Sequence, residues 1–164
     1  MLESRPVNGQ QAIKSGPEKL FNLLTGFNIF DADGRPVEHA ELPEFDFLVV
    51  APMSLRKRLI EEIDAVVSQF RDTGTGRIVF KLNSLVDKEI IQALYRASKV
   101  GISIRLIVRG ICCLRPGVKG VSENIEVISI VDRFLEHSRI YYFETSSENR
   151  VYIGSADCMP RNLD

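Results

Sequence analysis

The hydrophobic residues of this chain recur with two spacings, one typical of helices and the other typical of strands. Apolar residues at every third or fourth position predict an amphipathic helix over residues 54–70. A second helix is predicted after Asn83 and Ser84, which can cap its first turn, and Gly101 is expected to end it. Short apolar or alternating runs predict strands over residues 47–51, 77–82, 102–108, 124–131, 140–143 and 151–154.

Strands and helices alternate along the chain, and this order favours an α/β sheet with at least partly parallel pairing. In such sheets, ligands bind beyond the carboxyl ends of the strands. Arg109 directly follows the predicted strand over residues 102–108 and is therefore a candidate for binding phosphate oxygens. Further cations lie at or just beyond strand ends, although each can equally be a solvated surface charge. They are Lys81, Arg115, Lys119, Arg133, Arg139 and Arg161.

The N-terminal quarter lacks this regular pattern. Residues 1–17 show no periodicity, residues 18–24 favour a short helix, and residues 31–46 are acidic and interrupted by glycine and proline. We therefore predict a tail, helix and loop over residues 1–44 and a folded domain over residues 45–164. His39 lies in the acidic loop, where a solvated histidine is expected.

Composition excludes several classes of protein. Hydrophobic residues make up 45% and charged residues 26% of the chain, as in soluble globular proteins, and no apolar run is long enough to span a bilayer. The N-terminus does not resemble a signal peptide, so we expect a cytoplasmic location. The net charge of −1 predicts no general affinity for nucleic acid. Three cysteines without a CxxC pair, beside only two histidines, predict reduced thiols and no protein metal site.

The last third of the chain carries the strongest candidate chemistry. His137 and Arg139 are two residues apart at the start of an apolar run, so a strand would project both from one face. The following strand would return Gly154 and Ser155 to the same end of the sheet. An imidazole, a guanidinium and a hydroxyl together suit phosphate chemistry, whereas a hydrogen-bonded structural histidine is the alternative. Neither GxGxxG nor GxxxxGK[ST] occurs, which argues against a dinucleotide fold or a P-loop.

Several blocks of the sequence, in order, resemble the bacterial polyphosphate kinase family. They are Lys81–Asp87, Leu94–Ser98, Leu106–Cys112, Ser129–Arg139, Gly154–Asp157 and Met159–Asp164. The resemblance implies a phospholipase D-like fold, a mixed, partly parallel sheet flanked by helices. That fold carries H-x-K and G-S-x-N elements. His137-Ser138-Arg139 is similar to the first, with arginine for lysine, and Gly154–Asp157 is similar to the second, with aspartate for asparagine.

The resemblance also implies a function. Family members transfer the terminal phosphate of ATP to inorganic polyphosphate through a phosphohistidine, using Mg²⁺. Arg109 and His137 match nucleotide-binding positions, with His137 in a supporting catalytic role, and Arg139 and Ser155 are further phosphate-binding candidates. In the family, the phosphorylated histidine and the Mg²⁺-associated residues belong to a preceding domain. The resemblance implies that this chain lacks that domain, so the isolated chain is expected to be inactive. The implied partners are ATP or ADP, polyphosphate, the rest of the same polypeptide and further copies of the full-length protein. The full-length protein is also expected to lie at the periphery of the inner membrane.

Two other functions stay open at this stage. One is a phospholipase D-like phosphodiesterase that forms its site by dimerisation, and the other is a non-catalytic module that binds phosphate or nucleotides. The role of Arg139 is also open, because it can orient His137, contact phosphate, or pair with Glu136 or Glu144. Ser155 and Asp157 are expected to position their loop. Cys158 stands where the family usually has tryptophan.

Overall fold

The computed structural model describes residues 48–130 and 137–164, and residues 50–164 form one compact unit. Several predictions lie outside the described residues. They are the tail, the helix over residues 18–24, the acidic loop with His39, the boundary between residues 44 and 45, and Arg133 and Glu136. These remain predictions.

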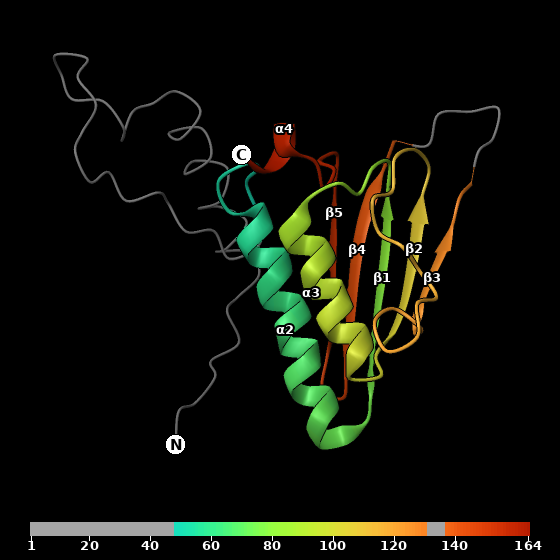
Figure 1. The fold of residues 1–164 in the computed structure, drawn as a ribbon. Helices are drawn as coiled ribbons and strands as arrows, with labels where there is room; N and C mark the ends of the chain where they lie inside the picture. Colours follow the sequence, from blue (N-terminus) through green and yellow to red (C-terminus); the bar gives the residue numbers. More distant parts are fainter. Residues whose placement is uncertain (1–47, 131–136) are drawn as a thin grey trace, which may run out of the picture. The chain divides into compact units, whose positions relative to one another are not determined.

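The described residues form a five-stranded mixed sheet, which confirms the predicted partly parallel α/β architecture (Figure 1). The strands are β1 Gly76–Leu82, β2 Ser103–Val108, β3 Ile125–Ile128, β4 Arg139–Thr145 and β5 Asn149–Gly154. Their order across the sheet is β3-β2-β1-β4-β5. The strands β1, β2 and β3 run parallel, whereas β4 is antiparallel to β1 and β5 is antiparallel to β4.

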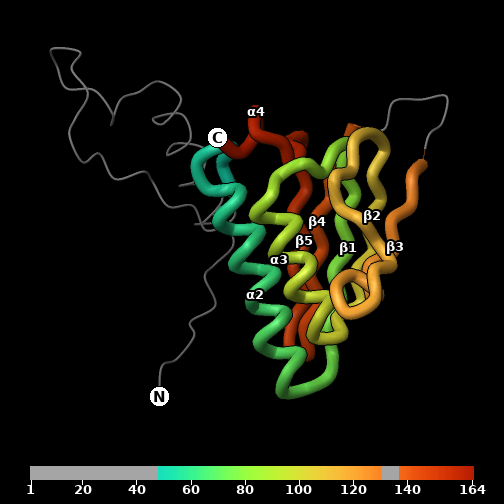
Figure 2. Tube along the Cα trace, viewed as in Figure 1, coloured from blue at the N-terminus to red at the C-terminus, as the bar shows by residue number. Residues whose placement is uncertain are grey.

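The strand register brings several chain segments to one end of the sheet. Lys81 near the end of β1 pairs with Ile107 of β2 and Ile140 of β4, and Arg139 pairs with Gly154 of β5. The residues that follow β1, β2, β3 and β5 therefore lie at the same end of the sheet as those that begin β4. We call this end of the sheet the carboxyl edge, and it is the upper edge of the sheet in Figures 1 and 2.

Two helices, α2 Leu55–Thr73 and α3 Lys88–Lys99, lie side by side on one face of the sheet (Figures 1 and 2). Alternate residues of β1 face them, so Ile78, Phe80 and Leu82 are buried while their neighbours are at least partly exposed. Phe80 makes edge-to-face contacts with Tyr141 and Phe143, at centroid distances of 5.0 and 5.5 Å. Burying each such ring contributes roughly 1.5–3 kcal/mol.

The predicted strand over residues 47–51 is wrong for its described part. Residues 48–50 have no regular structure and residues 51–53 form a turn that leads into α2. The Ser54 hydroxyl accepts a hydrogen bond from the backbone N–H of Val50 at 3.0 Å, which fixes this turn before the helix. An apolar run alone therefore predicted the wrong local structure here.

The start of α3 also differs from the expected cap at Asn83 and Ser84. The helix is capped by Asp87, whose Oδ1 accepts a hydrogen bond from the backbone N–H of Ile90 at 2.9 Å. The backbone N–H groups of the preceding residues bond to other segments: Leu85 donates to the Ile111 carbonyl and Val86 donates to the Cys158 carbonyl. The segment after β1 is thus part of the carboxyl edge rather than of the helix.

Other boundaries moved by only a few residues. The first helix extends to Thr73 and ends at Gly74, which has a left-handed φ of 69° that favours glycine. The strand predicted over residues 124–131 is ordered as β3 over four residues. A short helix, α4 Pro160–Leu163, was not predicted. Within the described ranges, neither long helix is apolar enough to cross a membrane.

Candidate functional site at the carboxyl edge

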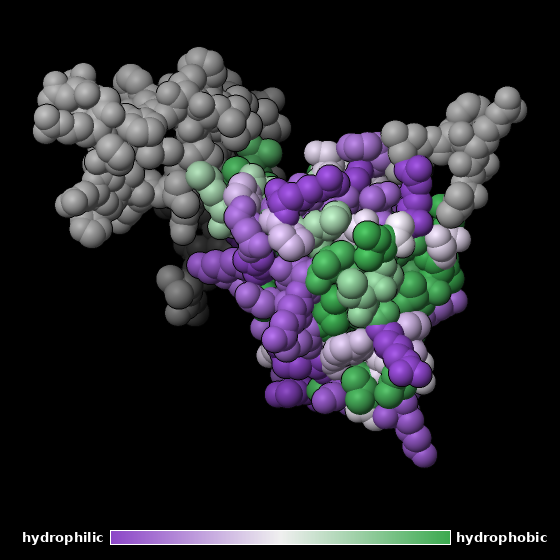
Figure 3. All heavy atoms as spheres, turned by 45° about the horizontal axis from the view of Figure 1, so that its top comes forward, coloured by the Kyte–Doolittle hydropathy of each residue, from purple (hydrophilic) through white to green (hydrophobic). Residues whose placement is uncertain are grey.

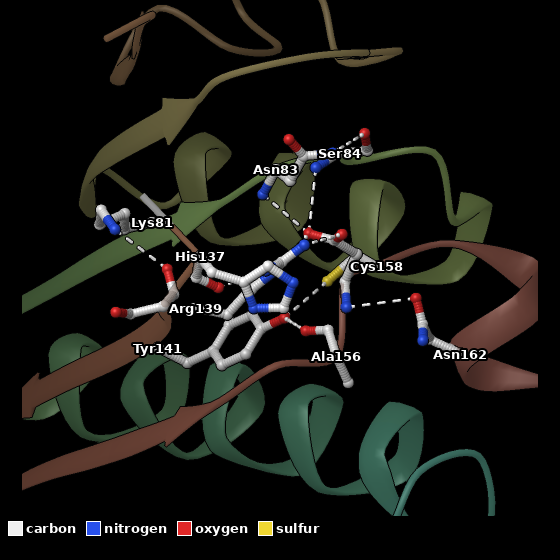
Figure 4. A network of polar contacts seen from close by, with 11 residues as sticks. Lys81, Asn83, Ser84, His137, Arg139, Tyr141, Ala156, Cys158 and Asn162 are labelled. Atoms are coloured by element: carbon white, nitrogen blue, oxygen red, sulfur yellow. Dashed lines mark hydrogen bonds and ion pairs between the residues drawn. The ribbon is translucent and has the colours of Figure 1, made fainter. Parts of the chain in front are cut away.

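The carboxyl edge brings together residues that are far apart in the sequence. Arg109 follows β2, His137 precedes β4, Arg139 begins β4 and Ser155 follows β5. All four were predicted as site residues, and the register places them at one end of the sheet as expected. Figure 4 shows part of this edge from close by, including His137, Arg139 and their polar neighbours.

Arg109 is exposed at this edge, and its backbone is held firmly. Its N–H donates to the Leu82 carbonyl at 3.2 Å, and the N–H of Gly110 donates to the Asn83 carbonyl at 2.7 Å. A Cβ at position 110 would lie only 3.0 Å from that carbonyl oxygen, so the close approach favours glycine. The Arg109 guanidinium makes no hydrogen bond or ion pair with the described residues, and it is therefore available to a ligand.

Arg139 has a different environment from the one that strand alternation predicted. Its side chain is only 7% exposed and forms two hydrogen bonds with Asp157, from Nε to Oδ1 at 3.0 Å and from Nη2 to Oδ2 at 2.7 Å. Pairing with Glu144, one of the alternatives left open for Arg139, is wrong, because Arg139 pairs with Asp157 and Glu144 accepts a hydrogen bond from Tyr142 at 3.0 Å. Binding of phosphate by Arg139 stays a prediction, which a buried and neutralised guanidinium does not favour.

Asp157 joins the segments after β1 and β5. Its side chain is 1% exposed, and Oδ1 accepts the backbone N–H groups of Asn83 at 2.7 Å and Ser84 at 3.1 Å. Burial alone would raise the pKa of this carboxyl, but the hydrogen bonds from Arg139 and the two backbone groups outweigh it and lower the pKa. The Asp157 hydrogen bond in turn raises the pKa of Arg139. Asp157 therefore stays ionised and fixes its loop, as expected.

His137 and Ser155 are both exposed at the edge. The carbonyl oxygen of His137 accepts a hydrogen bond from Nη1 of Arg139. The next carbonyl, that of Ser138, accepts from Nζ of Lys81 at 3.0 Å. Figure 4 shows that Lys81 and Arg139 reach the segment before β4 from two different strands. The backbone at His137 is thus held while its imidazole remains accessible.

A buried network beside the site was missed by sequence reasoning. The Tyr141 hydroxyl donates to the Ala156 carbonyl at 2.7 Å and lies 3.8 Å from the Cys158 sulfur. Burial raises the pKa of the Cys158 thiol to about 12, so this cysteine is an uncharged packing residue. The three cysteines are free, as predicted. The sequence signal was the Gly154–Asp157 motif, which marked the loop but not Tyr141.

The rim of the carboxyl edge carries exposed apolar side chains. Arg115 and Lys119 are exposed but do not lie on this rim, where the sequence placed them just beyond the end of β2. Their loop folds back to the start of β3, where the hydroxyl of Ser122 donates to the Arg115 carbonyl at 2.7 Å and the Ser122 carbonyl accepts from the N–H of Ile125. Ile111, Ile130 and Ile153 are 59%, 57% and 75% exposed. Figure 3, with this end tilted forward, shows green apolar atoms among purple hydrophilic ones. Such a mixed surface is typical of an interface with another protein segment.

The opposite end of the sheet has another character. A hollow of about 220 Å³ there is lined by side chains that include Arg77, Arg105 and Glu126. Arg105 is neutralised by Glu126 at 2.7 Å, and both side chains are about half exposed. No cluster of three histidine, cysteine or carboxylate side chains occurs among the described residues.

The sequence is similar to that of a known protein family. Residues 48–164 match the family model described as polyphosphate kinase C-terminal domain 2. The chain belongs to the polyphosphate kinase family. The matched residues include all the described strands and helices, so the carboxyl edge is part of a polyphosphate kinase domain.

Polyphosphate kinases of several bacteria are similar to this chain. Polyphosphate kinase 1 of Chlorobaculum tepidum is 53% identical over 146 residues, which cover 89% of this chain and 19% of that protein. The polyphosphate kinase of Synechocystis is 52% identical over 144 residues, covering 88% and 18%. The crystal structure of polyphosphate kinase from Porphyromonas gingivalis has a TM-score of 0.74 and 38% identity, and covers 90% of this chain and 21% of that chain. The chain thus spans about a fifth of these polyphosphate kinases.

Proposed function

We propose that residues 48–164 supply one side of the active site of a polyphosphate kinase, which transfers the terminal phosphate of ATP to inorganic polyphosphate. The observation that carries this proposal is the exposed guanidinium of Arg109 at the carboxyl edge of a domain of this family. A guanidinium without a protein partner in the described residues can donate several hydrogen bonds to phosphate oxygens.

Each site residue has a role that its environment supports. Arg109 binds phosphate oxygens of ATP, ADP or polyphosphate and stabilises their charge during transfer. His137, exposed at the same end of the sheet, donates a hydrogen bond or a proton to a phosphate oxygen. Ser155 is a further donor, whereas the charge of Arg139 is already balanced by Asp157.

The proposed site is completed by the remainder of a full-length polyphosphate kinase. Supporting this, the chain spans about a fifth of its relatives, and isoleucine side chains are exposed around the carboxyl edge. The phosphorylated histidine and the Mg²⁺ ligands would belong to that remainder. Bound there, Mg²⁺ would neutralise phosphate charge. Assembly of full-length copies, cytoplasmic location and peripheral contact with the inner membrane are further parts of this proposal.

A graft into a complete enzyme tests the proposal. Residues 48–164 replace the matching segment of Chlorobaculum tepidum polyphosphate kinase 1, and polyphosphate formation from ATP and Mg²⁺ is measured. Arg109→Ala should raise KM for ATP about 10- to 100-fold, the effect of losing one hydrogen bond to a charged group. His137→Ala should lower kcat about 100-fold, as for loss of a proton donor.

Arg71→Ala is the matched control, because Arg71 is an exposed arginine in the last turn of α2, away from the carboxyl edge. It should leave both kinetic constants unchanged. Unchanged kinetics in Arg109→Ala and His137→Ala would contradict the proposal. Hydrolysis of a phosphodiester by the 164-residue chain without ATP would favour the phosphodiesterase instead. Binding of polyphosphate by the chain, combined with an inactive graft, would favour a non-catalytic module.

A further inference from the structure

The buried pair of Arg139 and Asp157 is not explained by stability alone. Their side chains are 7% and 1% exposed, so both charges have been removed from water. Well-packed apolar residues often replace such pairs without loss of stability, because desolvation offsets the attraction. What the pair provides, and apolar residues cannot, is a set of directed hydrogen bonds.

These hydrogen bonds connect two of the proposed phosphate-binding residues. Arg139 donates to the carbonyl oxygen of His137 and, through its other nitrogens, to the carboxylate of Asp157. Asp157 Oδ1 accepts the N–H of Asn83 at 2.7 Å, and the Asn83 carbonyl accepts the N–H of Gly110 at 2.7 Å. Gly110 is the residue after Arg109. An unbroken path of hydrogen bonds thus runs from the backbone of His137 to the backbone beside Arg109.

Among the described residues, a single hydrogen bond holds the backbone at His137. His137 lies outside β4, its side chain is exposed, and its only hydrogen bond with the described residues is the one from Arg139. The neighbouring Ser138 carbonyl is held by Lys81. Loss of the pair would therefore release the backbone at His137 from the segment after β1.

We propose that Arg139 and Asp157 are positioning residues that set the spacing between His137 and Arg109, so that the imidazole and the guanidinium meet the same phosphate chain. This proposal rests on the proposed function. The pair does not touch the ligand itself but acts through His137 on one side and through Asn83 and Gly110 on the other. Catalytic groups held out of place by about an ångström can lose on the order of 100-fold in rate.

The test uses Arg139→Lys and Asp157→Asn in the grafted Chlorobaculum tepidum enzyme, with and without His137→Ala. Both substitutions are conservative, because lysine keeps the positive charge and asparagine keeps an oxygen that accepts the Asn83 N–H. We expect each to lower kcat/KM about 10- to 100-fold when His137 is present. In the His137→Ala background the same substitutions should lower kcat/KM by a markedly smaller factor, because they act partly through the imidazole, which this background lacks.

The matched control is the exposed pair of Arg105 and Glu126 at the opposite end of the sheet, which has the same 2.7 Å separation. Arg105→Lys and Glu126→Gln should leave kcat/KM unchanged in both backgrounds. Folding of every variant is followed by the cooperativity of its thermal unfolding.

Three outcomes would overturn the positioning role. Equal losses with and without His137 would mean that the pair acts only through general structure. No loss in either variant would mean that spacing does not depend on the pair. Loss of cooperative unfolding in both conservative variants would make the pair a folding element alone. If instead Arg109→Ala and His137→Ala leave activity unchanged, the proposed function itself fails, independently of Arg139 and Asp157.

Discussion

The end of β2 and the start of β4 each present an arginine at the carboxyl edge, but in opposite environments. Arg109 is exposed and has no side-chain partner among the described residues, whereas Arg139 is 7% exposed and doubly hydrogen-bonded to Asp157. From the sequence, both were phosphate-binding candidates at strand ends. The difference teaches that a strand-end arginine is available to a ligand only when the fold supplies no carboxylate to it.

The largest expected effect on stability comes from removing the charge of the buried Arg139. Arg139→Met leaves the ionised Asp157 carboxylate buried without its counter-charge, and unfolding free energy should fall by about 3–5 kcal/mol. Urea denaturation of the chain, followed by circular dichroism, measures this loss. Arg109→Met, the same change at the exposed position, should alter the free energy by less than about 0.5 kcal/mol. Equal effects at the two positions would remove the distinction.

A third arginine, which is exposed but paired with a buried carboxylate, sharpens the comparison. Arg150 is 44% exposed but pairs at 2.9 Å with Glu62, a carboxylate of α2 that is only 3% exposed and also accepts from Tyr152 at 2.6 Å. Burial and the Glu62 hydrogen bond raise the pKa of Tyr152 to about 12. We expect Glu62→Gln to lower the free energy of unfolding by about 1–3 kcal/mol.

Glu61→Gln is the control for this change in the same urea experiment. Glu61 is the adjacent residue of α2, about half exposed, and its ion pair with Lys57 spans 3.9 Å. A surface pair of this kind contributes little, so the substitution should change stability by less than about 0.5 kcal/mol. A larger effect in Glu61→Gln than in Glu62→Gln would show that burial does not govern these pairs.

The pH dependence of stability gives a smaller effect with a definite sign. Because the pKa of Asp157 is lower in the folded chain than in the unfolded chain, the unfolded chain binds more protons as the pH falls below about 4. The stabilisation from Asp157 is therefore present above that pH and is lost as the pH falls through the folded pKa. The stability difference between the parent and Asp157→Asn should shrink from pH 7 to pH 2 in urea titrations. A constant difference would contradict the prediction.

A small effect is also expected from the exposed pair of Arg105 and Glu126. Glu126→Gln should change the free energy of unfolding by less than about 1 kcal/mol, and added salt should reduce even this change. The free energy of unfolding is measured at low and high salt for Glu126→Gln and for Arg139→Met. These measurements compare the exposed pair with the buried pair, both of which have a 2.7 Å separation. A salt-independent loss as large as that of Arg139→Met would remove the difference between them.

The local sequence pattern predicts some elements correctly, whereas others depend on tertiary contacts. The amphipathic spacing over residues 54–70 identified α2, because a helix that covers a sheet must bury one stripe. The apolar run over residues 47–51 predicts a strand, but its described part is irregular and leads into a turn, since apolar character alone does not reveal the hydrogen bond between Val50 and Ser54. The start of α3 was misplaced because Leu85 and Val86 bond to distant carbonyls that no local pattern reveals.

The sequence by itself determined the partly parallel α/β sheet, the strand-end positions of Arg109, His137 and Ser155, and the resemblance to polyphosphate kinases. These follow from residue spacing and from motifs, which are local properties of the chain. Only the tertiary structure decided that Arg139 is buried against Asp157 while Arg109 stays exposed. The reason is physical: Asp157 lies 18 residues from Arg139, and only the antiparallel pairing of β4 with β5 brings the two side chains together.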